Sequence, residues 1–297
     1  MLSLIALGYQ TICAMLILYA MLGIASFSVM RKTRSIPHNQ LRLQVNAWWF
    51  IFPVVSLSLL LYPLGPALLA LVIAALALRE LAVHHSNPRW RFQILCISVL
   101  ALLIVMSWHQ PQHILFVFPC LVAVQLLRFL FQKQANQLLF LLFLFMCHGV
   151  SFIIQLMQLP LPPETKLAWL FYLFAMTALN DIGQFITGKF FGKQKIVERI
   201  SPNKTWQGLA GGVLISLLAS VALGSYLELA NFSRLVFFAL LLSLGGFAGD
   251  ILFSAAKRFL GIKDFSKLIP GHGGILDRVD SLVVTAPLLY LAIYFYS

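Results

Sequence analysis

Residues 235–256 read LVFFALLLSLGGFAGDILFSAA, and a second apolar run, residues 279–296, follows shortly afterwards. Each run is close to the roughly 20 apolar residues with which a helix crosses a bilayer. Between them, residues 263–280 read KDFSKLIPGHGGILDRVD, a segment rich in charge and glycine. This pattern predicts two membrane-spanning helices joined by a polar connection.

The whole composition points the same way. The 297 residues are 61% hydrophobic and only 10% charged, whereas soluble domains carry about 25% charged residues. The net charge of +12 is carried by short segments between apolar runs. No basic soluble domain exists to hold nucleic acid, so an anionic membrane surface or an anionic substrate is the favoured partner.

Windows of about 20 apolar residues predict an all-α, polytopic integral membrane protein with about ten transmembrane helices. The expected spans are residues 5–30, 46–62, 64–80, 92–108, 113–131, 136–158, 167–187, 208–229, 235–256 and 279–296.

Numbering the connections alternately places 19 Lys and Arg residues on one side and two, Lys166 and Arg234, on the other. Positively charged connections stay in the cytoplasm. We therefore expect an integral protein of the cell inner membrane, with residues 263–280 on the cytoplasmic side and both termini on the other side.

The acidic residues are unevenly distributed within one predicted membrane domain, residues 1–297. Residues 1–166 contain only Glu80 and Glu164, which is typical of a lipid-embedded scaffold. The other seven acidic residues lie in 167–297, so catalytic helices and cytoplasmic loops are expected there. Asp181 is the first of them, in the cytoplasmic half of a span. A carboxylate at that depth is costly unless it is paired or functional.

Ser201 before Pro202 predicts a helix N-cap with Pro at the first helical position. The same N-terminus, with Lys204 and Thr205, is a candidate anion-binding site. Beyond it, small residues recur every four positions and predict close helix packing. They are Gly208, Gly212, Ser216, Ser220 and Gly224.

Residues 250–280 hold nine of the thirty charged residues of the chain. Asp250 lies near the end of one span, and Asp277 and Asp280 lie one turn apart at the start of the next. Three carboxylates at one interface suit Mg²⁺, which takes its remaining ligands from water and phosphate oxygens. Glycines around His272 would let a tight loop approach a bulky anion. The anion-binding charge would come from Lys257, Arg258, Lys263, Lys267 and Arg278.

These residues resemble the signature of a known family. The pattern is Ser254-x2-Lys257-Arg258-x4-Lys263-Asp264-x-Ser266-x2-Ile269-Pro270-x-His272-Gly273-Gly274-Ile275-x-Asp277-Arg278-Val279-Asp280. It is similar to that of the phosphatidate cytidylyltransferases, the CDP-diacylglycerol synthases. Segments 181–193 and 201–212 resemble the same family more loosely. Ile182, Phe185 and Gln207 depart from its usual residues.

The resemblance implies that CTP and phosphatidate give CDP-diacylglycerol and diphosphate at the bilayer, with Mg²⁺ as cofactor. Asp250, Asp277 and Asp280 would hold the metal. Lys257, Arg258, Lys263 and Arg278 would neutralise phosphates, and Asp264 belongs to the same catalytic segment. Substrate-binding roles would fall to Asp181, Ser201, Lys204, Thr205, Ser254, Gly273 and Gly274. His272 and the two glycine amides would contact the leaving group.

Three alternative functions compete with this one. The departures allow a diverged paralogue that acts on another phospholipid or alcohol phosphate. A CDP-alcohol phosphotransferase would need a DGxxAR element, and the chain contains no Asp-Gly dipeptide. A transporter would show related polar interruptions in both halves, whereas polarity here is confined to the second half. The sequence leaves a homodimer open.

Overall fold

The computed structural model describes residues 7–32, 40–86, 88–109, 111–269, 271 and 273–296. Ten long helices lie within these residues: α2 (Tyr9–Lys32), α3 (Gln40–Leu60), α4 (Leu64–His84), α5 (Arg89–His109), α6 (Pro111–Gln132), α7 (Ala135–Gln158), α8 (Pro163–Phe191), α9 (Trp206–Tyr226), α10 (Phe232–Phe259) and α11 (Leu276–Tyr296). Each predicted span corresponds to one of them. The described residues contain isolated β-bridges but no strand, so the all-α prediction is confirmed.

Nine of the helices in the described part of the chain are long and apolar enough to cross a membrane. The other is α8, whose 29 residues span roughly 44 Å at 1.5 Å per residue. Asn180, Asp181 and Gln184 lower its hydropathy. Large apolar side chains such as Phe50 (76% exposed) and Phe131 (87% exposed) face outward, as they do where lipid is the solvent. The chain is an integral membrane protein.

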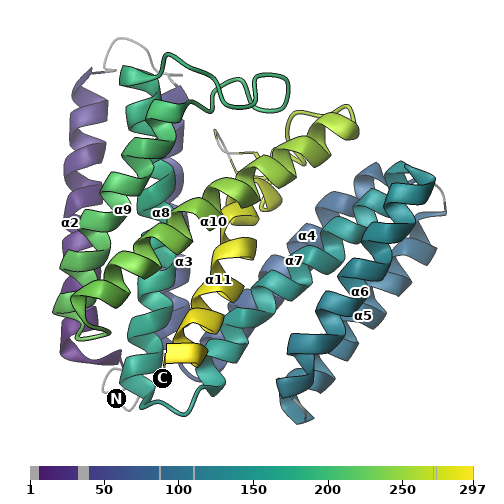
Figure 1. Cartoon of the computed structure of the whole chain (residues 1–297), viewed down its shortest axis with the longest axis horizontal. Helices are drawn as coiled ribbons and strands as arrows, with labels where there is room; N and C mark the ends of the chain where they lie inside the picture. Colours follow the sequence, from purple (N-terminus) through teal and green to yellow (C-terminus); the bar gives the residue numbers. More distant parts are fainter. Residues whose placement is uncertain are drawn as a thin grey trace.

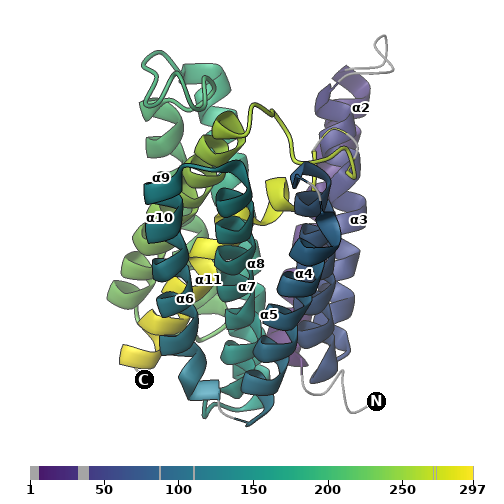
Figure 2. The ribbon, with the colours of Figure 1, turned by 90° about the vertical axis from the view of Figure 1, so that its right-hand side faces the viewer.

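The helices form two groups that meet along α7, α10 and α11 (Figure 1). In the first half α7 packs against α4, α5 and α6, and it reaches the second half through α11. In the second half α8 packs along α9, while α10 packs against both α9 and α11. The start of α2 and the end of α11 lie at the same end of the helices, and both polar connections lie at the opposite end (Figure 2). This arrangement agrees with a chain that crosses the membrane an even number of times.

The predicted stripe of small residues on α9 is confirmed, since its five members are buried along that helix. Gly212 lies so close to Gln184 of α8 that a larger side chain would displace it. Ser220 donates a 2.7 Å hydrogen bond to the carbonyl oxygen of Leu235 on α10. Close packing of α9 therefore brings the polar residues of α8 next to α10.

Candidate functional site

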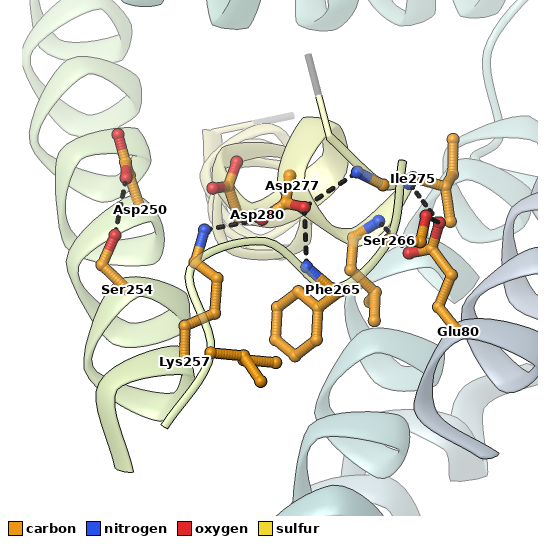
Figure 3. Close-up of polar contacts among 12 residues, drawn as sticks. Glu80, Asp250, Ser254, Lys257, Phe265, Ser266, Ile275, Asp277 and Asp280 are labelled. Carbon is orange, nitrogen blue, oxygen red and sulfur yellow. Dashed lines mark hydrogen bonds and ion pairs between the residues drawn. The ribbon is translucent and has the colours of Figure 1, made fainter. Parts of the chain in front are cut away.

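Asp250, Ser254 and Lys257 lie on one face of α10, four and three residues apart, and that face is turned toward α11 (Figure 3). Ser254 donates a 3.3 Å hydrogen bond to Asp250 Oδ1. Ser254 and Lys257 are both buried. The helical period of 3.6 residues accounts for the shared face, so α10 supplies three polar side chains to one interface.

Asp277 in the first turn of α11 forms a buried ion pair with Lys257. Lys257 Nζ lies 2.6 Å from Asp277 Oδ1. Asp277 Oδ2 accepts from the backbone N–H groups of Phe265, at 3.1 Å, and Gly274, at 2.8 Å. Both carboxylate oxygens therefore have protein donors, and the side chain ties α10, the connecting loop and α11 together.

A second group of charges lies beside this pair. Asp280 is buried one turn further along α11 and is within electrostatic reach of Asp250 and Asp181. Asp181 on α8 accepts a 3.2 Å hydrogen bond from Ser281 Oγ. Helices α8, α10 and α11 thus contribute one carboxylate each to the same region. Like charges so close together repel one another unless a cation or a bound proton offsets them.

Lys204, in the α8–α9 connection, provides part of that balance. It forms an ion pair with Asp250 and donates a 3.0 Å hydrogen bond to Gln184 Oε1. Burial by itself lowers the pKa of Lys204, but the carboxylates of Asp250 and Asp181 outweigh burial and raise this pKa above its ordinary value. Lys204 is therefore a permanent cation at neutral pH.

The N-cap of α9 is Thr205, so the prediction that Ser201 caps this helix is wrong. Thr205 Oγ1 accepts from the Gly208 N–H at 3.0 Å, whereas Ser201 lies in a turn in which its carbonyl oxygen accepts from the Lys204 N–H at 3.2 Å. A β-bridge between Lys195 and Thr205 closes the connection. This bridge delays the helix start by several residues, which local sequence preferences do not reveal.

The remaining predicted basic residues differ in their surroundings. Arg258 donates to two backbone carbonyl oxygens, those of Ile200 and Ile262, each at 3.1 Å, so it braces the loops. Lys263 and its neighbour Asp264 are exposed. Arg278 is also exposed and acts electrostatically on the carboxylates of the second group.

The glycine-rich turn before α11 is closed by its own backbone. Ile269 and Gly273 exchange N–H···O bonds of 2.8 and 3.1 Å. Gly271 and Gly273 adopt φ values of +75° and +83°, a conformation that side chains disfavour. The amides of Gly273 and Gly274 both have protein acceptors, so contact with a leaving group would require these bonds to open. His272 lies outside the described residues.

The predicted metal ligands do not form one cluster. Among the residues that the structure describes, no three Asp, Glu, His or Cys side chains are placed to hold a metal ion. Asp250 and Asp280 lie in one group with Asp181, whereas Asp277 faces Lys257. Direct ligation of a metal by Asp277 stays a prediction.

Sequence reasoning missed Glu80, which was assigned to the lipid-embedded scaffold. Glu80 is 4% exposed and accepts hydrogen bonds from the preceding loop and the first residue of α11 (Figure 3). The available signal was a lone acidic residue, next to Arg79, at the end of an apolar run.

Comparison with known proteins relates this chain to one family. A model of the cytidylyltransferase family matches residues 42–296. The Escherichia coli K12 protein called "Uncharacterized protein YnbB" is 46% identical over 119 residues, which cover 40% of each chain. Phosphatidate cytidylyltransferases of Staphylococcus epidermidis and Staphylococcus aureus are 40% and 42% identical over 124 residues, covering 41% of this chain and 48% of each relative. The match thus spans less than half the length of these curated relatives.

Proposed function

Because this chain belongs to the cytidylyltransferase family, we propose that it transfers a cytidylyl group from CTP to phosphatidate, giving CDP-diacylglycerol and diphosphate. One observation carries the proposal. Four carboxylates and two lysines from α8, α10, α11 and the α8–α9 connection meet where the apolar helices end. A water-soluble triphosphate and a lipid phosphate can both reach such a place.

The donor set fits Mg²⁺, which is bound through one or two carboxylates together with substrate phosphates and water. Asp250 and Asp280 are the residues that would hold it, with Asp181 beside them. When bound, the metal would neutralise the nucleotide phosphates. Asp277 would act differently from the sequence-based expectation, because its two oxygens hold Lys257 and the loop amides in place.

The reaction needs little proton chemistry, because the phosphate of the lipid is already ionised near neutral pH. A lipid phosphate oxygen forms a bond to the α-phosphorus of CTP while the bond from that phosphorus to the β-phosphate oxygen breaks. Both reactants are anions, so their repulsion must be cancelled. Lys204 and Lys257 would supply fixed positive charge, and the exposed Lys263 and Arg278 would meet the incoming triphosphate.

We place the site on the cytoplasmic face of the cell inner membrane, with both termini on the other face. The charge distribution supports this orientation, because 19 of the 21 Lys and Arg residues fall on one side of the predicted topology. The chain would function as a single membrane domain in which residues 167–297 carry the chemistry. The acyl chains of the lipid would remain in the bilayer beside the exposed apolar helices.

The departures from the family pattern do not favour another substrate. Gln207 Oε1 accepts from the backbone N–H groups of Lys193 and Gln194 at 3.0 and 3.2 Å. A carboxylate at this position would accept the same two bonds, so Gln207 has a structural role. Ile182 and Phe185 are exposed on α8 and lie outside the group of charges. Phosphatidate therefore remains the proposed acceptor.

The test is cytidylyl transfer by the purified full chain in vesicles that contain phosphatidate. Labelled CTP is added with and without Mg²⁺, and lipid-linked label is measured. We expect labelled CDP-diacylglycerol only with the divalent metal, and a loss of about 100-fold or more in Asp280→Asn. Gln125→Leu is the matched control, because Gln125 is buried and bonded between α6 and α7.

Each measurement tests a different part of the proposal. Label appearing without any divalent metal would exclude the metal site. Equal activity in Asp280→Asn and in the control would exclude the assigned carboxylate. Transfer to another lipid phosphate, with phosphatidate untouched, would leave nucleotidyl transfer standing and refute the proposed acceptor.

A further inference from the structure

Glu80 belongs to the half of the chain that carries none of the proposed chemistry, yet its carboxylate contacts the catalytic segment. Glu80 Oε1 accepts from Ser266 Oγ at 2.6 Å and from the Ile275 N–H at 2.8 Å. Glu80 Oε2 accepts from the Leu276 N–H at 3.1 Å. All three donors lie within residues 263–280, almost 200 positions further along the chain.

These contacts complete the N-terminus of α11. The first N–H groups of a helix have no partner within the helix, and a negative charge there is favourable because the helix dipole is positive at that end. Asp277 takes the N–H of Gly274 from within α11. Glu80, which lies on α4, accepts hydrogen bonds from the next two N–H groups, those of Ile275 and Leu276. The end of α11 is thus capped by two carboxylates, one local and one from a distant helix.

A second contact from α4 supports the same segment. His84, one turn beyond Glu80, has its Nε2 atom 2.9 Å from the carbonyl oxygen of Phe265. The N–H of Phe265 is held by Asp277. The loop is therefore fixed on one side by α4 and on the other by the Lys257–Asp277 pair of α10 and α11 (Figure 3).

We propose that Glu80 is a positioning residue for the proposed reaction, setting where α11 begins and thereby placing Asp277, Arg278 and Asp280 against α10. Packing alone would not require a carboxylate at this position. Glu80 is buried, and neither of the ion pairs in the described residues involves it. A buried charge without a cationic partner is costly unless hydrogen bonds satisfy it, and here its hydrogen-bond donors come from the catalytic segment.

The effect of Glu80 on catalysis rests on the proposed function, but its effect on the loop of residues 263–280 does not. The experiment therefore measures the order of this loop separately from activity. Trypsin cleaves after Lys263 and Lys267, which are both exposed in the loop. The full chain in detergent is treated with trypsin, and the fragments from these two sites are quantified by mass spectrometry. Glu80→Gln keeps the shape of the side chain but places an NH₂ group against backbone donors. Ser266→Ala removes one contact, and Gln125→Leu removes a buried polar contact in the first half away from the loop.

We expect loop cleavage to rise about tenfold or more in Glu80→Gln and in Glu80→Ala, because local opening becomes easier. Ser266→Ala should show a smaller rise, and Gln125→Leu should match the unmodified protein. In the transfer assay, Glu80→Gln should lower kcat and raise the KM for CTP, while the KM for the lipid stays constant. Failure of Glu80→Ala to fold would leave Glu80→Gln to decide.

Two results would overturn the proposal. One is unchanged loop cleavage and unchanged CTP kinetics in Glu80→Gln. The other is an equal rise in Gln125→Leu, because the effect would then be a general loosening of the helices. Faster loop cleavage in a protein that forms no CDP-lipid at all would retain the positioning contact and refute the proposed function instead.

Discussion

Replacement of Asp277 by Asn is the most informative perturbation of the site. Asp277 is the acceptor for Lys257 at 2.6 Å and for two backbone N–H groups. The side chains of both ion-pair partners are buried, at 11% exposure for Lys257 and 4% for Asp277. The substitution leaves a buried ammonium group without its counter-charge and turns an acceptor oxygen into a donor.

The expected cost follows from that burial. Removing one partner of a buried ion pair destabilises a protein by about 3–5 kcal/mol, against a total stability of about 5–15 kcal/mol. Lys257→Met should cost less, about 1–3 kcal/mol, because Asp277 keeps its two backbone donors. Adding Lys257→Met to Asp277→Asn should restore part of the loss, since no unpaired charge remains.

The assay is unfolding of the purified protein in mixed micelles by titration with SDS, applied to both single variants and the double variant. The coupling free energy from this cycle should reach about 1–3 kcal/mol. Asp264→Asn is the matched control, because Asp264 is an exposed carboxylate in the same loop. Its stability should stay within about 0.5 kcal/mol of the unmodified protein.

Additive effects in the cycle, with Asp277→Asn as stable as the Asp264→Asn control, would refute the reasoning. The Lys257–Asp277 pair would then have no structural role. Asp277 would be free to ligate a metal, as the sequence pattern suggested.

Three further predictions concern the surroundings of the site. Lys204→Met should lower cytidylyl transfer by about 100-fold. Because the pKa of Lys204 is raised, its charge and the stabilisation it provides persist below about pH 10 and are lost only as pH rises through the folded-state pKa. The kcat measured from pH 6 to 9 should therefore show no alkaline decline due to this residue. Thr205→Ala should cost about 1 kcal/mol in unfolding experiments through loss of the N-cap, whereas Ser201→Ala should cost less than about 0.5 kcal/mol; the reverse order would restore the sequence-based assignment. Gly249→Ala should reduce stability by about 1–3 kcal/mol and also reduce transfer activity, because a methyl group there would overlap a backbone oxygen of α11. Gly23→Ala is the control, since Gly23 lies in open space. Equal thermal stability of the two variants would contradict this account of α10–α11 packing.

Much of the fold was predictable because lipid imposes a simple rule. A backbone in hydrocarbon must satisfy its own hydrogen bonds, so each apolar run of sufficient length becomes a helix. The stripe of small residues on α9 was predictable for a related reason, since close approach of helices requires small side chains. The N-cap at Thr205 was not predictable, because the bridge to Lys195 that delays the helix depends on a contact across the connection.

The candidate site was likewise predictable in part from the sequence. The chain has few charged residues, and their types and spacing predicted where anionic substrates would bind. Which carboxylate faces which lysine depends on the rotation of α10 against α11, and spacing along one helix does not specify that rotation. Asp277 and Asp280 are one turn apart, yet Asp277 pairs with Lys257 while Asp280 faces Asp250 and Asp181.

The sequence by itself determined that this chain is a helical membrane protein and that seven of its nine acidic residues lie in the second half. These properties depend on local composition and on the free energy of transfer into lipid, which are additive along the chain. Only the tertiary structure decided the partners of each charge and brought Glu80 of α4 to the start of α11. Contacts between residues almost 200 positions apart arise from helix packing, and the pattern within a single segment does not encode them.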